Sequence, residues 1–179
     1  MRAGARCSRE GLRLSFFGQD YLISYPELVV YDPKGEECKE EYQALILDYL
    51  RNADGTPPLG EWLGFRELPE GQFYSKAFQG YTGDLLVREF GNDVKKFRQA
   101  AEALGGTSLG LGSAAYAFQV LPHLRLAVVY WEGEDEEGFP PRANVLFDAA
   151  ASRYLPTDGL AILGRLLCAK LIKLKAGRR

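Results

Sequence analysis

Histidine and cysteine are scarce in this 179-residue chain, which has one histidine and three cysteines. A single histidine, His123, leaves no histidine-rich metal site and no catalytic pair of histidines. Cys7, Cys38 and Cys168 are odd in number and far apart, so they predict neither a disulfide framework nor the paired spacing of a zinc or iron-sulfur site. We therefore expect no metal site and a reducing cytoplasm, and the sequence specifies no cofactor.

Long apolar runs are also missing. No stretch reaches the roughly 18 uncharged apolar residues of a membrane span, and the first ten residues lack the apolar segment of a secretory signal. These observations predict a cytoplasmic protein with no membrane partner. The formal net charge is −2, and acidic residues surround most of the aromatic ones, which argues against a nucleic-acid partner.

The glycine-rich phosphate loops of nucleotide-binding proteins are absent too. The chain has no G-x-x-x-x-G-K-[ST] loop and no G-x-S-x-G nucleophile elbow. Residues 110–115 superficially match G-x-G-x-x-A, but they follow a predicted helix and precede a predicted strand. A dinucleotide loop needs the reverse order, so this segment is better interpreted as a turn.

What the chain does contain is the composition of an ordinary globular domain, with 46% hydrophobic and 26% charged residues. Its length suits one domain over residues 1–179, and no linker divides it. Within it we expect residues 1–11 to be a flexible N-terminal segment and residues 176–179 a basic tail.

Short β-prone runs and helical periodicities follow one another along the chain. Three short strands are predicted at 12–16, 21–25 and 28–31, followed by a helix over 36–53. Residues 59–68 fit either a strand or an ordered loop. Later elements are a helix through Phe90 capped by Thr82 or Asp84, a helix over 94–104, strands at 115–121, 124–131 and 143–147, and a helix over 160–175.

This order lacks regular alternation of strand and helix, which favours the α+β class. We expect a single mixed or antiparallel sheet of about five or six strands, with helices packed on it. The apolar strand 126–131 suits a central position that is covered on both faces.

An acidic segment follows that strand, with five carboxylates within residues 132–137. Such a loop could hold Ca²⁺ or Mg²⁺ through oxygen ligands, or meet a basic partner. It lacks the alternating spacing of an EF-hand loop, and charge runs usually face water. A solvated turn therefore remains the simpler interpretation.

Polar and aromatic residues gather at the ends of the apolar strands, where binding groups often sit on a rigid scaffold. We therefore predict a ligand-binding site, in which Arg66 faces an anion and carboxylates accept hydrogen bonds. Several aromatic residues could form the walls for a flat ligand, although core packing explains them equally well. They are Phe16, Phe17, Phe65, Phe73, Tyr74, Phe78, Tyr81, Tyr130 and Trp131. The predicted site residues are Phe65, Arg66, Glu67, Trp131, Glu132, Asp135 and Asp148.

Several of these segments together resemble a known prokaryotic family, the domain of unknown function 3786 family, found mainly in anaerobes. They are 59–68, 88–91, Leu121-Pro122, 129–139, 145–148 and 154–156, in the same order, and the similarity covers about residues 12 to 168. Some members resemble fusions with a cysteine-rich iron-sulfur segment at the N-terminus. The resemblance thus implies a link to cofactor or redox metabolism, although this chain has only Cys7 in that region.

Three classes of function stay open. The leading hypothesis is a non-catalytic module that binds a cofactor-sized molecule or a protein partner. An enzyme could instead use paired carboxylates as acid and base, with Glu132 or Asp135 working against Glu67 or Asp148. The third class is a structural assembly subunit, and the sequence does not fix the oligomeric state.

Overall fold

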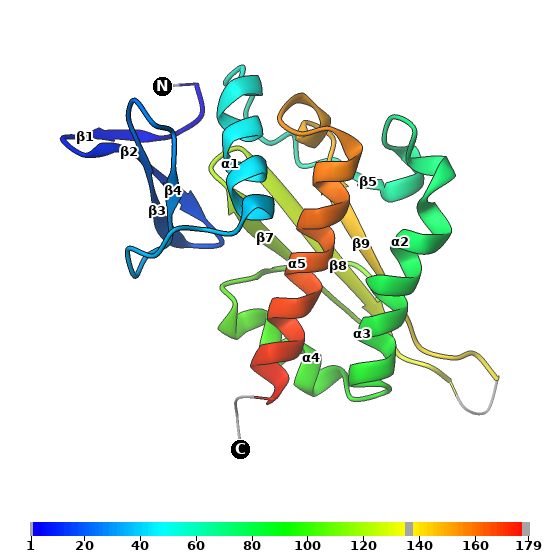
Figure 1. Cartoon of the computed structure of the whole chain (residues 1–179). Helices are drawn as coiled ribbons and strands as arrows, with labels where there is room; N and C mark the ends of the chain where they lie inside the picture. The colour runs from blue at the N-terminus through cyan, green and yellow to red at the C-terminus, as the bar shows by residue number, and fades with distance from the viewer. Residues whose placement is uncertain (1, 135–137, 177–179) are drawn as a thin grey trace.

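Helices and two antiparallel sheets make up the protein, which was analysed as a computed structural model (Figure 1). The structure describes residues 2–134 and 138–176. The α+β class is confirmed, but the expectation of one sheet is wrong, because four strands form one sheet and five form another. Among the described helices, none combines the length and the apolar character that crossing a bilayer requires.

The first sheet is built from neighbouring strands in the order β1-β2-β3-β4. The strands β2 (Gly11–Phe16), β3 (Gln19–Ser24) and β4 (Val30–Tyr31) are the three predicted from the sequence. The strand β1 (Arg6–Ser8) lies in the segment that was expected to be flexible and pairs with β2. Before it, Ala3 is buried and its carbonyl oxygen accepts a hydrogen bond from the Tyr49 hydroxyl at 3.0 Å.

The turn between β2 and β3 contacts the larger sheet. Phe17 and Gly18 both have positive φ, as the tight two-residue turn between β2 and β3 requires. The backbone N–H of Phe17 donates to the carbonyl of Val120 at 2.8 Å, near a bulge in the larger sheet. Strand β2 has β1 on one edge and β3 on the other, so neither edge is available to a strand of the second sheet.

The second sheet has the order β5-β9-β8-β7-β6, with every pair antiparallel. The three strands predicted in this region are β7 (Ala114–Leu121), β8 (Leu124–Trp131) and β9 (Arg142–Asp148), and β7 and β8 form a hairpin. The ambiguous segment contains β5 (Trp62–Gly64), which pairs with β9. The strand β6 (Thr107–Leu109) lies in a glycine-rich segment for which no strand was predicted.

Five α-helices accompany the sheets in the described chain: α1 (Glu40–Asn52), α2 (Ser75–Tyr81), α3 (Gly83–Phe90), α4 (Val94–Ala103) and α5 (Thr157–Ala176). Asp93 caps α4 by accepting a hydrogen bond from the Lys96 N–H at 3.0 Å. Thr82 precedes α3, but its hydroxyl donates to the Phe78 carbonyl at 2.5 Å, so the predicted cap by this side chain is wrong.

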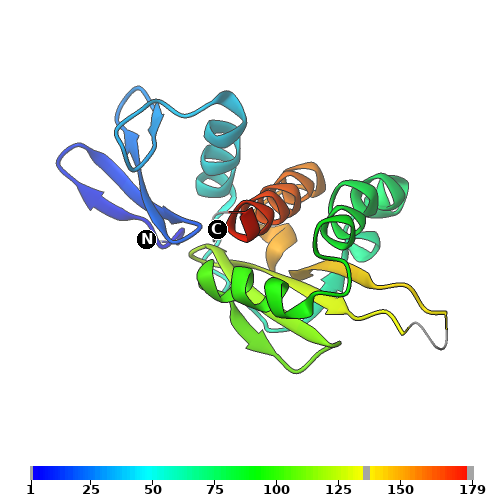
Figure 2. The same cartoon turned by 90° about the horizontal axis from the view of Figure 1, so that it is seen from below.

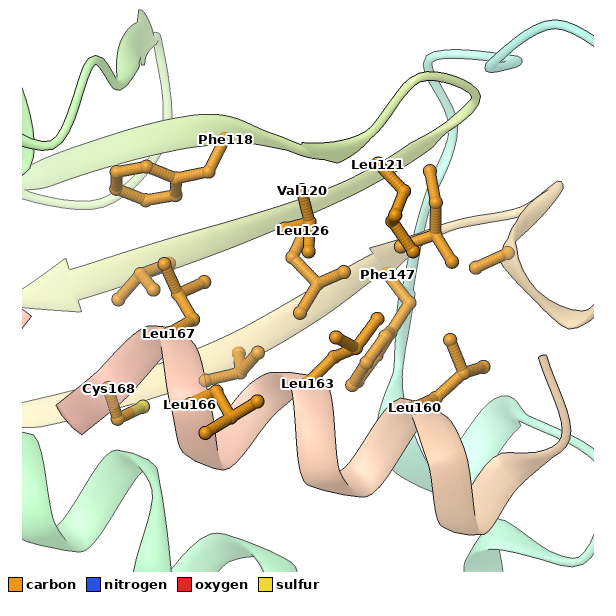
Figure 3. Packing of buried hydrophobic residues seen from close by; sticks show 14 of the residues in the cluster. Phe118, Val120, Leu121, Leu126, Phe147, Leu160, Leu163, Leu166, Leu167 and Cys168 are labelled. Atoms are coloured by element: carbon orange, nitrogen blue, oxygen red, sulfur yellow. The ribbon is translucent and has the colours of Figure 1, made fainter. Parts of the chain in front are cut away.

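The core lies between the second sheet and α5. Leu160, Leu163 and Leu167 of α5 point toward the sheet residues Leu126 and Phe147 (Figure 3), and all five are completely buried. Each such side chain contributes about 1.5 to 3 kcal/mol by leaving water. The helices α2 to α5 lie on one face of this sheet, and α1 lies between α5 and the first sheet (Figures 1 and 2).

The opposite face of the second sheet carries no helix of the described chain (Figure 2). Small residues make up its centre, because Ala115 pairs with Val129 and Ala117 pairs with Ala127 on that side. These four residues are at most 2% exposed. Strand β8 is central in this sheet and its residues on both faces are buried, as the sequence predicted; Ala127 on one face and Tyr130 on the other are both completely buried.

Candidate functional site

The residues predicted as one site lie at two places on the second sheet. Trp131 pairs with Arg142 at the start of β9, whereas Asp148 pairs with Trp62 at the end of β9. These two positions are six residues apart along β9, which corresponds to about 20 Å. The structure therefore groups Phe65, Arg66, Glu67 and Asp148 near one end and Trp131 with Glu132 near the other; Asp135 lies outside the described residues.

Asp148 is the most highly constrained of these groups. Its carboxylate is buried and accepts three backbone hydrogen bonds, from Leu59 (2.9 Å), Gly60 (2.7 Å) and Ala150 (2.9 Å). Both oxygens are occupied, so the side chain fastens the turn before β5 to the end of β9. This use of the carboxylate is structural, and it leaves little capacity for a ligand.

The neighbouring polar residues are solvent-facing. Glu67 follows Phe65 in the short 3₁₀ turn η1 (Phe65–Glu67), and its Oε2 accepts from the Gly64 N–H at 2.6 Å. Arg66 is exposed. At the other end, the backbone N–H of Glu132 donates to Ser113 Oγ at 2.9 Å, while the Glu132 residue is exposed.

Both tryptophans lie on the face of the second sheet that is opposite to the helices, which we call the open face. Residues 142, 144, 146 and 148 of β9 lie on this face, and Trp131 pairs with residue 142 and Trp62 with residue 148. The guanidinium of Arg142 lies 5.9 Å from the Trp131 ring centroid, and that of Arg125 lies 5.6 Å from the Trp62 ring centroid. A hollow of about 300 Å³ borders Trp131, Arg142 and Asn144. Each indole is thus already covered by a cation from its own chain.

A larger hollow, of about 720 Å³, lies between α2 and α5, and we call it the α2/α5 groove. One wall is formed by Tyr74, Ala77 and Tyr81, and the other by Asp158, Ala161, Ile162 and Arg165. Both sets have the spacing of a single helical face, which presents residues three, four and seven positions apart. Phe65, Pro69, Leu155 and Pro156 also line it, so its surface is mainly apolar.

Close aromatic packing fixes the distance between the two helices. The ring of Phe78 on α2 stacks on Phe65, with 4.0 Å between centroids and 10° between planes. On α5, a Cβ at Gly164 would lie 2.7 Å from the Phe78 ring, so only glycine fits there without a shift. Above this contact, Ala77 and Ala161 are too small to fill the remaining space.

Hydrogen bonding holds the groove where α5 begins. The Thr157 hydroxyl donates to the Pro69 carbonyl at 2.6 Å, which joins the first residue of α5 to the loop before α2. Asp158 and Glu70 place carboxylates at this end. Phe73 and Tyr74 remain 75% and 69% exposed beside it, a large aromatic surface to leave in water.

The opposite end of the groove is cationic. Of the described residues that line the groove, Arg165 is the only basic one, and it forms an ion pair with Glu41 of α1. Burial raises the pKa of the Tyr81 hydroxyl, and the nearby charge of Arg165 opposes that rise. The groove is therefore apolar in its middle, acidic at the end near Asp158 and basic at the end near Arg165.

Sequence reasoning found part of this site. It named Phe65 as a site residue and counted Tyr74 and Tyr81 among possible aromatic walls. It missed Ala161, Ile162 and Arg165, although their helical spacing with Asp158 was visible on the face of α5 away from its leucines. The helix α2, which makes the second wall, was not predicted.

Metal-binding groups do not converge within the part of the chain that the structure describes, since it holds no cluster of three or more His, Cys, Asp or Glu side chains suited to a metal. Cys168 is buried in α5, and burial raises its pKa to about 12. Burial also raises the pKa of Cys38, and Asp32 and Glu37 add to this effect. His123 lies in the turn between β7 and β8 and stacks on Tyr154 with 5.9 Å between centroids.

These features define an α+β protein whose helices form an apolar groove on one side of an antiparallel sheet. A family model described as "Domain of unknown function (DUF3786)" matches residues 1–170. The chain belongs to this family, so the resemblance found in its sequence is confirmed. No curated protein and no solved structure matched the chain.

Proposed function

We propose that the protein is a non-catalytic binding module that takes a flat, largely apolar small molecule into the α2/α5 groove. The observation that carries this proposal is the groove itself, whose volume of about 720 Å³ lies within the usual range for small-molecule sites. Its aromatic and aliphatic lining with few polar groups also has the usual composition of such sites.

Geometry favours binding over acid–base catalysis by the predicted carboxylates. Glu132 lies near one end of β9, and Asp148 lies at the other end, about 20 Å away. Asp148 also has both oxygens engaged by backbone N–H groups. A general acid or base must reach the reacting atom within hydrogen-bonding distance, which these two groups cannot do for one substrate.

We further propose that this module acts in the cytoplasm and is linked to cofactor or redox metabolism. The wide spacing of the three cysteines suits a reducing cytoplasm. A flat ligand would agree with the link to cofactor or redox metabolism that the family resemblance implies. The exposed ring of Phe73 beside the groove could contact a protein that delivers or receives the ligand.

A fluorescence titration with N-phenyl-1-naphthylamine, a neutral flat dye that brightens in apolar surroundings, tests the proposal. We expect saturable binding to the wild-type chain and at least about a tenfold loss in Ala161→Trp, whose indole would fill the groove; that loss corresponds to about 1.4 kcal/mol. Ala169→Trp is the matched control, because Ala169 is exposed on the same helix outside the groove.

Two results would overturn the proposal. One is the absence of saturable dye binding by folded wild-type protein. The other is equal dye affinity in the wild type and in Ala161→Trp, provided that circular dichroism shows both to be folded.

A further inference from the structure

The charged end of the α2/α5 groove specifies the ligand more closely. We propose, on the basis of the binding function above, that the groove selects a molecule with an anionic group at one end of its apolar body, bound by Arg165 in exchange for Glu41. Ligand capture would thereby release an ion pair that connects α5 to α1.

The first support is the position of Arg165 along the groove. Asp158 and Arg165 are seven residues apart on the same face of α5, which places them about 10 Å apart along the helix axis. An elongated ligand can therefore put an anion at Arg165 while its other end lies near Asp158. Glu70 and Asp158 repel an anion at that other end, so the orientation of the ligand is set by charge.

The second support is the hydrogen-bonding capacity of the guanidinium. Arg165 has five N–H donors, and among the described residues its hydrogen-bond partner is Glu41 alone, through Nη2. A planar guanidinium can bind a carboxylate or sulfonate through two parallel hydrogen bonds. Donors therefore remain for a ligand anion at the end of the groove.

The third support is that the existing ion pair is easily exchanged. The side chains of Arg165 and Glu41 are 43% and 40% exposed. Pairs exposed to this extent usually contribute little to stability, because water screens them and two flexible side chains must be held in place. An anion bound to the partly enclosed groove competes with Glu41 on favourable terms.

The charge of Arg165 acts on two tyrosines, one on each neighbouring helix. The charge of Arg165 lowers the pKa values of both Tyr42 on α1 and Tyr81 on α2, against the larger rise that burial causes. Its field thus reaches both helices that flank α5. A ligand anion at Arg165 would therefore interact electrostatically with α1 as well as with the residues of the groove.

Two dyes that share one aromatic framework separate this proposal from the binding function itself. N-phenyl-1-naphthylamine is neutral, and 1-anilinonaphthalene-8-sulfonate carries a sulfonate on the same framework. We expect the wild type to bind the sulfonate dye about tenfold more tightly than the neutral one. Arg165→Gln should abolish that preference, so that the ratio of the two dye affinities falls from about ten to about one.

Glu41→Gln supplies the test of exchange. Because it removes the internal competitor, we expect it to raise the affinity for the sulfonate dye severalfold and to leave the neutral dye unaffected. Glu40→Gln is its control, since Glu40 is also an exposed acid of the first turn of α1. Arg153→Gln is the control for Arg165→Gln, because Arg153 forms an exposed ion pair with Asp54 outside the groove.

The outcomes are distinguishable. Equal affinity of the wild type for the two dyes, or an unchanged preference in Arg165→Gln, would overturn the anion selectivity while the groove function stands. A Glu41→Gln variant that binds the sulfonate dye no better than Glu40→Gln does would overturn the exchange. Failure of both dyes to bind the wild type would overturn the proposed function.

Discussion

Gly164 of α5 and Phe78 of α2 meet so closely that a Cβ at position 164 would lie 2.7 Å from the Phe78 ring. Phe78 is held from its other side by the stack with Phe65. This contact sets how near α2 comes to α5 and leaves the α2/α5 groove open between Ala77 and Ala161. The groove thus depends on one glycine and two alanines at the points where the helices approach.

Replacing Gly164 by alanine should destabilise the protein. The added methyl group overpacks a buried site, which typically costs about 1 to 3 kcal/mol, more than the roughly 1 kcal/mol that alanine gains over glycine in a helix. Gly80→Ala on α2 is the control, since nothing lies within 4 Å of its Cβ position. Urea unfolding should show a loss for Gly164→Ala and no loss for Gly80→Ala; equal stabilities would refute the contact.

Asp148→Asn should also reduce stability, by about 2 to 3 kcal/mol, because a charged acceptor of backbone hydrogen bonds is lost. The amide retains one acceptor oxygen, so its NH₂ group faces a backbone N–H that the carboxylate had satisfied. The exposed ion pair between Asp20 and Arg6 provides the comparison, and Asp20→Asn should change the unfolding free energy by less than about 1 kcal/mol. Equal losses of stability in the two variants would show that the hydrogen bonds of Asp148 do not stabilise the contact between the turn before β5 and the end of β9.

Stability should decline in alkaline solution. Burial raises the pKa values of Cys168, Tyr21 and Tyr130 to about 12 in the folded protein. In the unfolded chain cysteine and tyrosine lose protons near pH 8.5 and 10. Between these pH values and about pH 12, the unfolded state therefore binds fewer protons than the folded state. The stabilising contribution is complete below those values and disappears as the pH rises toward 12.

Urea unfolding from pH 8 to pH 11 checks this expectation. Above about pH 8.5 the free energy of unfolding should fall with a slope that approaches about 1.4 kcal/mol per pH unit for Cys168 alone. Cys168→Ala should flatten the first part of that decline. A stability that stays constant or rises over this range would show that these groups titrate equally in both states.

Local patterns in the sequence predicted most elements of the fold. The apolar run from Leu126 to Trp131 indicated β8, and the leucine spacing from Leu160 indicated α5. The division into two sheets had no such local signal. The two sheets meet at the β2–β3 turn, where the Phe17 N–H donates to the carbonyl of Val120, about one hundred residues later in the chain.

The site was harder to predict than the fold because it depends on register and on helix approach. Trp131 and Asp148 lie on either side of the acidic segment in the sequence. Antiparallel pairing nevertheless places them at opposite ends of β9. Asp148 had the appearance of a binding group, and its three backbone partners are visible only in three dimensions. Arg165 became a candidate only once α2 was seen beside α5.

Amide chemical-shift mapping with N-phenyl-1-naphthylamine tests the central claim most directly, because it reports where the ligand binds. The account predicts that the perturbed amides cluster on the facing walls of the α2/α5 groove, at Ala77, Tyr81, Ala161 and Ile162. Perturbations that concentrate on the indole N–H groups of Trp62 and Trp131, on the open face of the second sheet, would contradict it.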